Sequence, residues 1–149
     1  MKYMGFQTVL TLTNLSERTM RRRIADGSLE TLQESGRTLI SVDSVKADFF
    51  LSLKQDDMDL IEKAENSNAD AQTDLALFFL ENDYAKSAVY WLELAIKKEF
   101  PDAMHLLGYC YLRGEGLAKD YSNAVMWIAK AASFGHKLAI AQITAMNNQ

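Results

Sequence analysis

The stretch FPDAMHLLGYCYLRGEGLAKDYSNAVMWIAKAASFG, residues 100–135, decides the fold. Its apolar residues recur three and four positions apart in two blocks, as in helices that bury one face. Pro101 suits the first turn of a helix, because its missing N–H would be unpaired there. Gly114, Gly116 and Gly135 suit helix ends. The stretch therefore predicts two helices joined by a glycine-containing loop.

Both blocks have an earlier copy in the chain. AVYWLELA at 88–95 parallels AVMWIAKA at 124–131, and NADAQTDLALFFL at 68–80 parallels FPDAMHLLGYCYL at 100–112. Repetition of units with helical spacing predicts stacked helix pairs. The expected helices lie near residues 57–66, 70–81, 84–98, 101–112, 120–133 and 137–146.

This pattern resembles the Sel-one-like repeat, a relative of the tetratricopeptide repeat, over about residues 57–146. The first copy lacks the Gly-rich loop and has Glu99 where Gly is usual. The resemblance implies an α-solenoid with a concave groove, which acts as an adaptor between proteins and has no catalytic machinery of its own. In the second copy, the matching residues are Ala103, Leu107, Gly108, Tyr111, Gly114, Glu115, Gly116, Asp120, Ala124, Trp127, Lys130, Ala131, Ala132 and Gly135.

Two stripes of side chains, one on the first helix of each copy, are expected to face that groove and to bind a partner. Alternatively, Leu77 and Tyr109 are core residues, as large apolar side chains at helical spacing usually are. The stripes are Thr73, Leu77 and Glu81, and His105, Tyr109 and Arg113.

The N-terminal part contains no copy of the repeat, so we expect two domains, residues 1–54 and residues 55–149. Ser16 can cap a helix that runs to Ile24, and Gly27 can end it. The segments Leu29–Gln33 and Thr38–Ser41 flank a turn and predict a β-hairpin. A further helix is expected from Asp43 to Leu53. Residues 8–14 form either a short helix or, because they are poor in helix formers, a strand.

This order of elements resembles the winged-helix DNA-binding domains of MerR regulators and phage excisionases, over roughly residues 7–52. The resemblance implies that the second helix enters the major groove of double-stranded DNA and that the hairpin wing contacts the backbone. Arginine suits both tasks, because it binds guanine edges and neutralises phosphates. The implied contacts are Arg18, Thr19, Arg21 and Arg22 from the helix, and Arg37 from the wing.

Charge is distributed unevenly along the chain of 149 residues, whose net charge is −4. Residues 1–54 carry eight Lys and Arg against six Asp and Glu, a balance of +2, so residues 55–149 carry −6. The basic excess is local, which fits a phosphate-binding surface in the first domain or, equally, a solvated helix face.

Composition sets further limits. With 48% hydrophobic residues the chain can bury a core without metals or disulfides, and Cys110 is its single cysteine. The N-terminus lacks the apolar stretch of a signal peptide or membrane span, so we expect a cytoplasmic protein without membrane contact. His105 and Cys110 are five positions apart and do not form a zinc motif, and GEG at 114–116 lacks the Lys-Ser/Thr of a phosphate loop. We therefore expect no metal, no cofactor, no catalytic residues and no enzymatic activity.

Three functional hypotheses follow. The first is a transcriptional regulator of bacterial or phage type, in which the winged helix binds DNA while the helical array forms a homodimer or recruits a partner protein. The alternative is a protein–protein interaction adaptor that does not bind DNA. An enzyme with a site between the domains is a third hypothesis, for which no carboxylates are identified.

Overall fold

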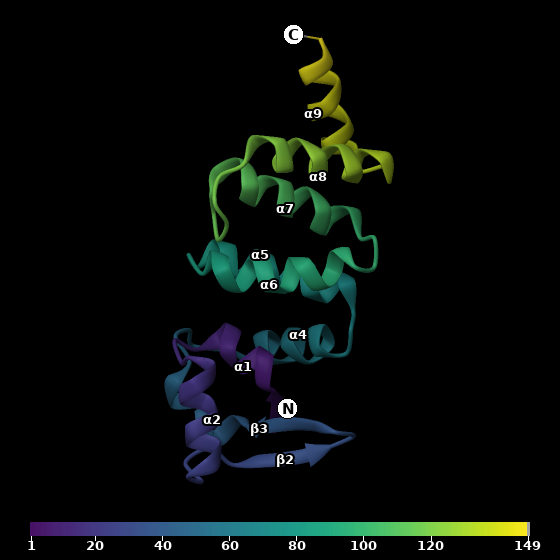
Figure 1. The fold of residues 1–149 in the computed structure, drawn as a ribbon. Coiled ribbons are helices and arrows are strands. Elements are labelled where there is room, and N and C mark those ends of the chain that lie inside the picture. Colours follow the sequence, from purple (N-terminus) through teal and green to yellow (C-terminus); the bar gives the residue numbers. More distant parts are fainter. Residues whose placement is uncertain (149) are drawn as a thin grey trace. The chain divides into compact units, whose positions relative to one another are not determined.

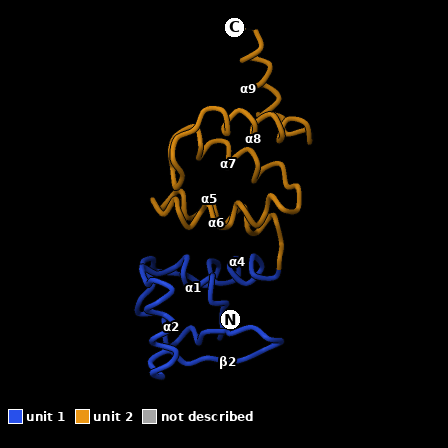
Figure 2. Tube along the Cα trace, viewed as in Figure 1, with its two compact units in different colours: residues 1–66 blue, residues 67–149 orange. Residues whose placement is uncertain are grey.

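The computed structural model describes residues 1–148, which are mainly helical with one small sheet (Figure 1). The chain divides into two compact units, Met1–Asn66 and Ser67–Gln149 (Figure 2). The boundary therefore lies after Asn66, whereas the sequence pattern predicts it after residue 54.

The first unit combines short helices with a three-stranded antiparallel sheet. The strand order is β1-β3-β2, so the hairpin strand β3 lies between its neighbours. The sequence did not predict β1, which is only three residues long. The elements are β1 (Tyr3–Gly5), α1 (Phe6–Leu12), α2 (Glu17–Ala25), β2 (Thr31–Glu34), β3 (Arg37–Ser41), α3 (Val42–Val45), the 3-10 turn η1 (Lys46–Asp48) and α4 (Gln55–Glu65).

The structure confirms α2 and the hairpin. The side chain of Ser16 accepts a hydrogen bond from the backbone N–H of Thr19 at 3.1 Å, which caps the helix as expected. Gly27 follows α2 with φ +81°, and Met20 of α2 is fully buried. Residues 6–12 are helical, which decides between the two alternatives in favour of a short helix.

The prediction of a helix from Asp43 to Leu53 is wrong. Only Val42–Val45 is α-helical, and after η1 the chain becomes extended. Phe49 forms a β-bridge with Thr13, and the N–H of Phe50 donates to the carbonyl of Leu12 at 3.1 Å. This pairing with the end of α1 satisfies backbone groups that a helix would otherwise pair, so it replaces the local helical preference.

The helix α4 packs within the first unit, although the resemblance to Sel-one-like repeats extends over about residues 57–146. Glu65 Oε1 accepts a hydrogen bond from the backbone N–H of Gly5 at 2.6 Å and another from the Thr8 hydroxyl. A carboxylate bound by a backbone N–H makes a strong, directional contact. Glu65 thus links the end of α4 to the start of α1.

The second unit is a stack of antiparallel helices, and it confirms the expected helical array. The helix α5 packs against α6, α7 against α8, and α9 against α8 (Figure 1). Trp91, Phe79 and Leu92 are fully or almost fully buried in its core. The helices are α5 (Ala69–Glu81), α6 (Ala85–Ile96), α7 (Pro101–Arg113), α8 (Tyr121–Ser133) and α9 (Lys137–Asn147).

The loops of the array depend on residues with positive φ. Gly114 ends α7 in the left-handed conformation with φ +69°, and Gly116 follows with φ +73°. The first copy lacks these glycines, and Asp83 in its short α5–α6 loop has φ +65°. In the next loop, between α6 and α7, Glu99 has φ +56°. Both loops therefore place an L-residue in a conformation that favours glycine.

Candidate binding groove

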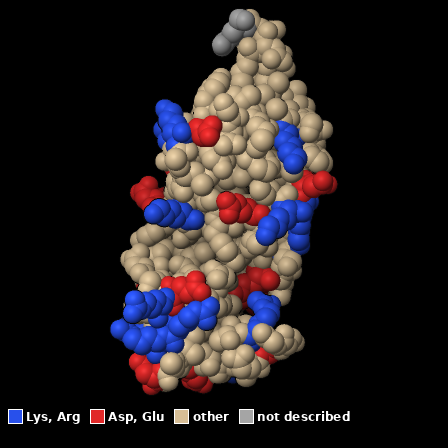
Figure 3. All heavy atoms as spheres, in the orientation of Figure 1, with Lys and Arg blue, Asp and Glu red and all other residues tan. Residues whose placement is uncertain are grey.

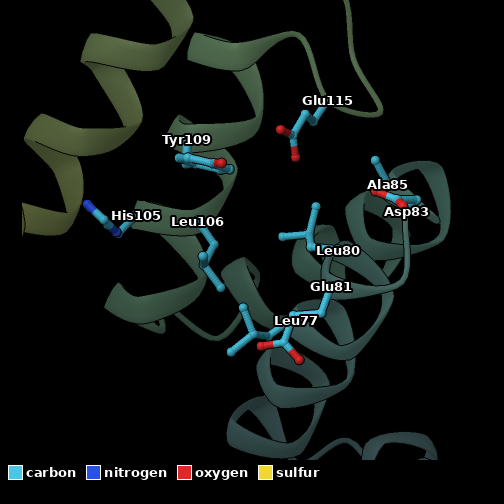
Figure 4. Close-up of a pocket in the computed structure, with 9 residues that line it drawn as sticks. All are labelled: Leu77, Leu80, Glu81, Asp83, Ala85, His105, Leu106, Tyr109 and Glu115. Carbon is cyan, nitrogen blue, oxygen red and sulfur yellow. The ribbon is translucent and has the colours of Figure 1, made fainter.

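An open cavity of about 550 Å³ lies between α5 and α7 in the second unit (Figure 4). Its floor and walls come from both helices, from the α5–α6 loop and the start of α6, and from the loop after α7. The lining residues are Leu77, Leu80, Glu81, Asp83, Ala85, His105, Leu106, Tyr109 and Glu115.

Each of the helices α5 and α7 buries one face in the stack and leaves the other face, which lines the cavity, accessible. Leu75 and Phe79 of α5 and Leu107 of α7 are buried in the helix stack. With 3.6 residues per turn, positions two residues away from a buried one point to the other side of the helix. Leu77 and Tyr109 therefore face outward, and they are 41% and 38% exposed.

Four of the six residues predicted to face the groove line this cavity: Leu77, Glu81, His105 and Tyr109. The exposure of Leu77 and Tyr109 argues against the alternative that both are core residues. Arg113 does not line the cavity, but its guanidinium lies 5.9 Å from the centre of the Tyr109 ring.

Thr73 does not belong to the site. It is buried, and its hydroxyl donates to the carbonyl of Ala69 at 2.8 Å within the same helix. This intrahelical hydrogen bond satisfies the hydroxyl without a ligand.

Five lining residues are not predicted by the sequence pattern. Leu80 and Leu106 are three positions from predicted residues on the same helices, so a wider helical stripe would have included them. Ala85 lies one helix further on, and Asp83 and Glu115 lie in loops, whose path no helical spacing predicts.

His105 connects the edge of the cavity to α9. Its Nε2 lies 2.8 Å from Gln142 Oε1, and its ring stacks on that of His136 with centroids 4.5 Å apart. Burial lowers the pKa of His105, while the Gln142 hydrogen bond acts in the opposite direction. His136 caps α9, since its Nδ1 accepts from the N–H of Ala139 at 3.1 Å, and its Nε2 lies 3.2 Å from Asp102 Oδ1. These contacts join neighbouring repeats.

Carboxylates surround the apolar part of the cavity. Glu81, Asp83 and Glu115 belong to its lining. Further along the same two helices, burial raises the pKa of Asp74, and repulsion by Asp70 and Asp102 raises it further. The lining of the groove therefore carries carboxylates at the end of α5 and in both adjoining loops.

A separate charged surface lies on and around α2, where Lys and Arg side chains gather beside carboxylates (Figure 3). Arg18 and Arg22 are exposed. Arg21 is paired with Glu17 at 2.7 Å and lies over the Phe6 ring, and Arg23 is paired with Asp48 at 2.9 Å.

The two remaining residues of the predicted DNA-binding set, Thr19 and Arg37, lie on α2 and on the hairpin. Thr19 receives a hydrogen bond from the Ser16 hydroxyl at 2.9 Å, and the exposed Arg37 begins β3 after the hairpin turn. All the residues that the resemblance to winged-helix proteins implies as DNA contacts thus belong to α2 or to the hairpin strand β3.

Metal-binding clusters and membrane spans are both absent from residues 1–148. In this part of the chain, no three His, Cys, Asp or Glu side chains are grouped so that they could hold a metal ion. No helix there combines the length and apolar character needed to cross a membrane. Cys110 is buried within α7, and burial raises the pKa of its thiol to about 11.

Comparison with known proteins identifies the second unit. The Sel1 repeat family matches residues 69–100 and 101–136, which begin at the starts of α5 and α7. The crystal structure of a Sel1 repeat protein from Oxalobacter formigenes is 31% identical with a TM-score of 0.51, and the match covers 58% of this chain and 68% of that one. The chain belongs to the Sel1 repeat family. Its repeats form a protein–protein interaction fold.

A second structural relative is c5321, a protective antigen present in uropathogenic Escherichia coli strains that displays an SLR fold. It is 32% identical with a TM-score of 0.52, and the match covers 55% of this chain. The chain spans only 18% of c5321. No curated protein matches the chain. The resemblance to Sel-one-like repeats seen in the sequence is thus confirmed for the array.

Proposed function

We propose that this Sel1 repeat protein is a non-enzymatic adaptor, and that the groove between α5 and α7 binds a segment of a partner protein. The observation that carries the proposal is the open cavity with Leu77 and Tyr109 exposed at its surface. Its volume of about 550 Å³ is large enough for whole side chains of a ligand.

Burial of apolar surface would supply the affinity. Leu77 and Tyr109 already bury more than half of their surface, and covering the remainder would contribute about 1 kcal/mol each. Tyr is also one of the residue types that most often dominate interface energetics. A partner segment that fills the cavity would therefore make its main contacts here.

Selection of peptides from a random phage-displayed library on the full chain tests the proposal. Each enriched peptide is then measured against a groove variant, Leu77→Ser with Tyr109→Ser. The control variant is Leu138→Ser with Ile140→Ser, because these α9 residues are 56% and 44% exposed and lie outside the cavity. All four positions are exposed, so both variants should fold.

We expect enriched peptides to lose affinity for the groove variant and to keep it for the control. Enriched peptides that bind the groove variant as well as they bind the original chain would overturn the proposal. A library that yields no binder would also count against it.

A second candidate function is binding of double-stranded DNA by the first unit, in a winged-helix arrangement. Support comes from Arg18 and Arg22, which are exposed on α2, and from Arg37 at the start of β3. These three cations lie on the elements that such domains use for the major groove and the backbone. On the same helix, Arg21 is paired with Glu17 and Arg23 with Asp48.

Fluorescence anisotropy with random-sequence duplex DNA at two salt concentrations tests this second function. Replacing Arg18 and Arg22 by Ala should weaken binding and lower the log–log salt slope by about one for each phosphate that is no longer neutralised. Arg113→Ala, an exposed arginine of the array, serves as the control. An equal decrease in DNA affinity for the Arg18/Arg22 variant and for Arg113→Ala, or no binding at low salt, would refute this second function. The adaptor function would then remain.

A further inference from the structure

The floor of the groove is apolar and comes from both first helices of the repeats. Leu80 and Leu106 extend toward the same open space as Tyr109, and Leu77 continues this surface along α5 (Figure 4). Such a surface favours an apolar side chain of a ligand over a charged one, because burial of an unpaired charge is costly.

Three carboxylates stand around this floor: Glu81 at the end of α5, Asp83 in the following loop and Glu115 in the loop after α7. Within residues 1–148, none of the three takes part in an ion pair. Glu115 reaches toward the cavity from its loop (Figure 4). The rim is therefore negative and lacks ion-pair partners within the described chain.

The packing of Gly116 explains the position of Glu115. A Cβ atom on Gly116 would lie 2.5 Å from the carbonyl oxygen of Ala85, so the loop backbone touches the start of α6. This close approach brings the loop after α7 to the end of α5, where Asp83 and Ala85 complete the rim.

The negative surface continues toward the other end of the two helices. Asp70 and Asp74 of α5 and Asp102 of α7 add carboxylates there, and burial together with repulsion by Asp70 and Asp102 raises the pKa of Asp74. Arg113 is a cation at the end of α7 that precedes Glu115, and its guanidinium lies 5.9 Å from the centre of the Tyr109 ring. The carboxylates outnumber it along the groove.

We propose that the ligand of the groove is a basic-apolar peptide segment. One apolar side chain enters the space between Leu80, Leu106 and Tyr109, and Lys or Arg residues beside it pair with Glu81, Asp83 and Glu115. This inference rests on the proposed adaptor function and adds the chemical class of the partner. Charge complementarity selects this class, because an acidic segment would place like charges against the rim.

The expected size of the effect follows from the position of the rim, where Glu81 and Asp83 are exposed and Glu115 is half-buried. Each exposed ion pair changes a binding constant by about 1.4- to 5-fold. Three such pairs together are expected to change it by roughly tenfold, and added salt should reduce the difference.

The test uses three pools of short fluorescein-labelled peptides that share a central Phe and otherwise carry random neutral residues. The residues on both sides of the Phe are Lys in the basic pool, Glu in the acidic pool and Gln in the neutral pool. Anisotropy is measured with the full chain, with the rim variant Glu81→Gln, Asp83→Asn, Glu115→Gln, and with Arg113→Ala.

The proposal expects the basic pool to bind the full chain most tightly and to lose roughly tenfold in affinity for the rim variant. The neutral pool should bind both proteins equally. Arg113→Ala should leave binding of the basic pool unchanged or strengthen it, since it removes a like charge.

The other outcomes overturn the inference and separate it from the proposed function. Equal binding of all pools, or preference for the acidic pool, would mean that the groove binds peptides without the proposed charge selection, and the adaptor function would stand. Failure of every pool, while library-selected peptides still bind at Leu77 and Tyr109, would have the same meaning. Failure of the pools and of the library selection together would refute both.

Discussion

Substitution of Gly116 by Ala should destabilise the second unit more than any conformational penalty alone explains. At φ +73° an L-residue costs about 1–2 kcal/mol. The new Cβ would also lie 2.5 Å from Ala85 O, 2.7 Å from Ala85 C and 2.9 Å from Val89 Cγ2. Because backbone atoms cannot rotate away, this overpacking adds about 1–3 kcal/mol, and we expect a total of about 2–5 kcal/mol.

Gly135→Ala is the matched control for the conformational part of that cost. Gly135 has φ +88°, yet no atom lies within 4 Å of the position that a Cβ would occupy there. Its substitution should therefore cost only about 1–2 kcal/mol. The difference between the two variants isolates the contact between the loop and α6.

Urea unfolding followed by tryptophan fluorescence measures this difference, because both tryptophans, Trp91 and Trp127, belong to the second unit. With an m-value of about 1–3 kcal/mol/M, Gly116→Ala should unfold at a urea concentration about 1 M lower than Gly135→Ala. Equal midpoints for the two variants would refute the argument that Gly116 is needed for close packing against Ala85.

Three further predictions use the same unfolding assay. Glu99→Gly should stabilise the second unit by about 0.5–1 kcal/mol, because Glu99 has φ +56°. The control Glu93→Gly, at an exposed position in the middle of α6, should destabilise it by about 1 kcal/mol. Destabilisation by both variants would contradict the prediction. The pKa of His105 is lower in the folded protein than its ordinary value of 6.5, so the unfolded chain binds this proton more tightly and stability should fall as the pH drops below about 6.5. His105→Gln should reduce this pH dependence. A pH profile of stability that is the same for the variant and the original chain would contradict the prediction. Burial raises the pKa of the Cys110 thiol to about 11, so a thiol reagent at neutral pH should label the native chain slowly and the unfolded chain rapidly. The rate of labelling should therefore rise across the urea transition. Rapid labelling without urea would contradict this prediction.

The helices of the array could be predicted because each one carries its own apolar stripe in the sequence. The stripe of α7 buries Leu107 on one side and exposes Tyr109 on the other, and the repeat offset transfers this pattern to Leu75 and Leu77 of α5. Local spacing of this kind is independent of distant contacts. The same spacing predicts four of the groove residues.

The errors arose where distant contacts decide the structure. The predicted helix through Leu53 fails because Phe49 and Phe50 pair with the end of α1. The helix α4 belongs to the first unit because Glu65 binds Gly5, sixty positions away. Helical spacing predicts Glu81 of the acidic rim but not Asp83 or Glu115, because both lie in loops and Glu115 reaches the cavity through a loop that packs on Ala85. Spacing along the chain contains no signal for any of these contacts.

The most direct test of the groove as the binding surface is a titration of the methyl-labelled full chain with one peptide of the Lys-Phe-Lys type, followed by NMR. The account predicts that the methyl resonances of Leu77, Leu80 and Leu106 shift with increasing peptide, while those of Leu138 and Ile140 on α9 remain in place. Shifts centred on α9 or on the first unit, with the three groove leucines unaffected, would contradict it.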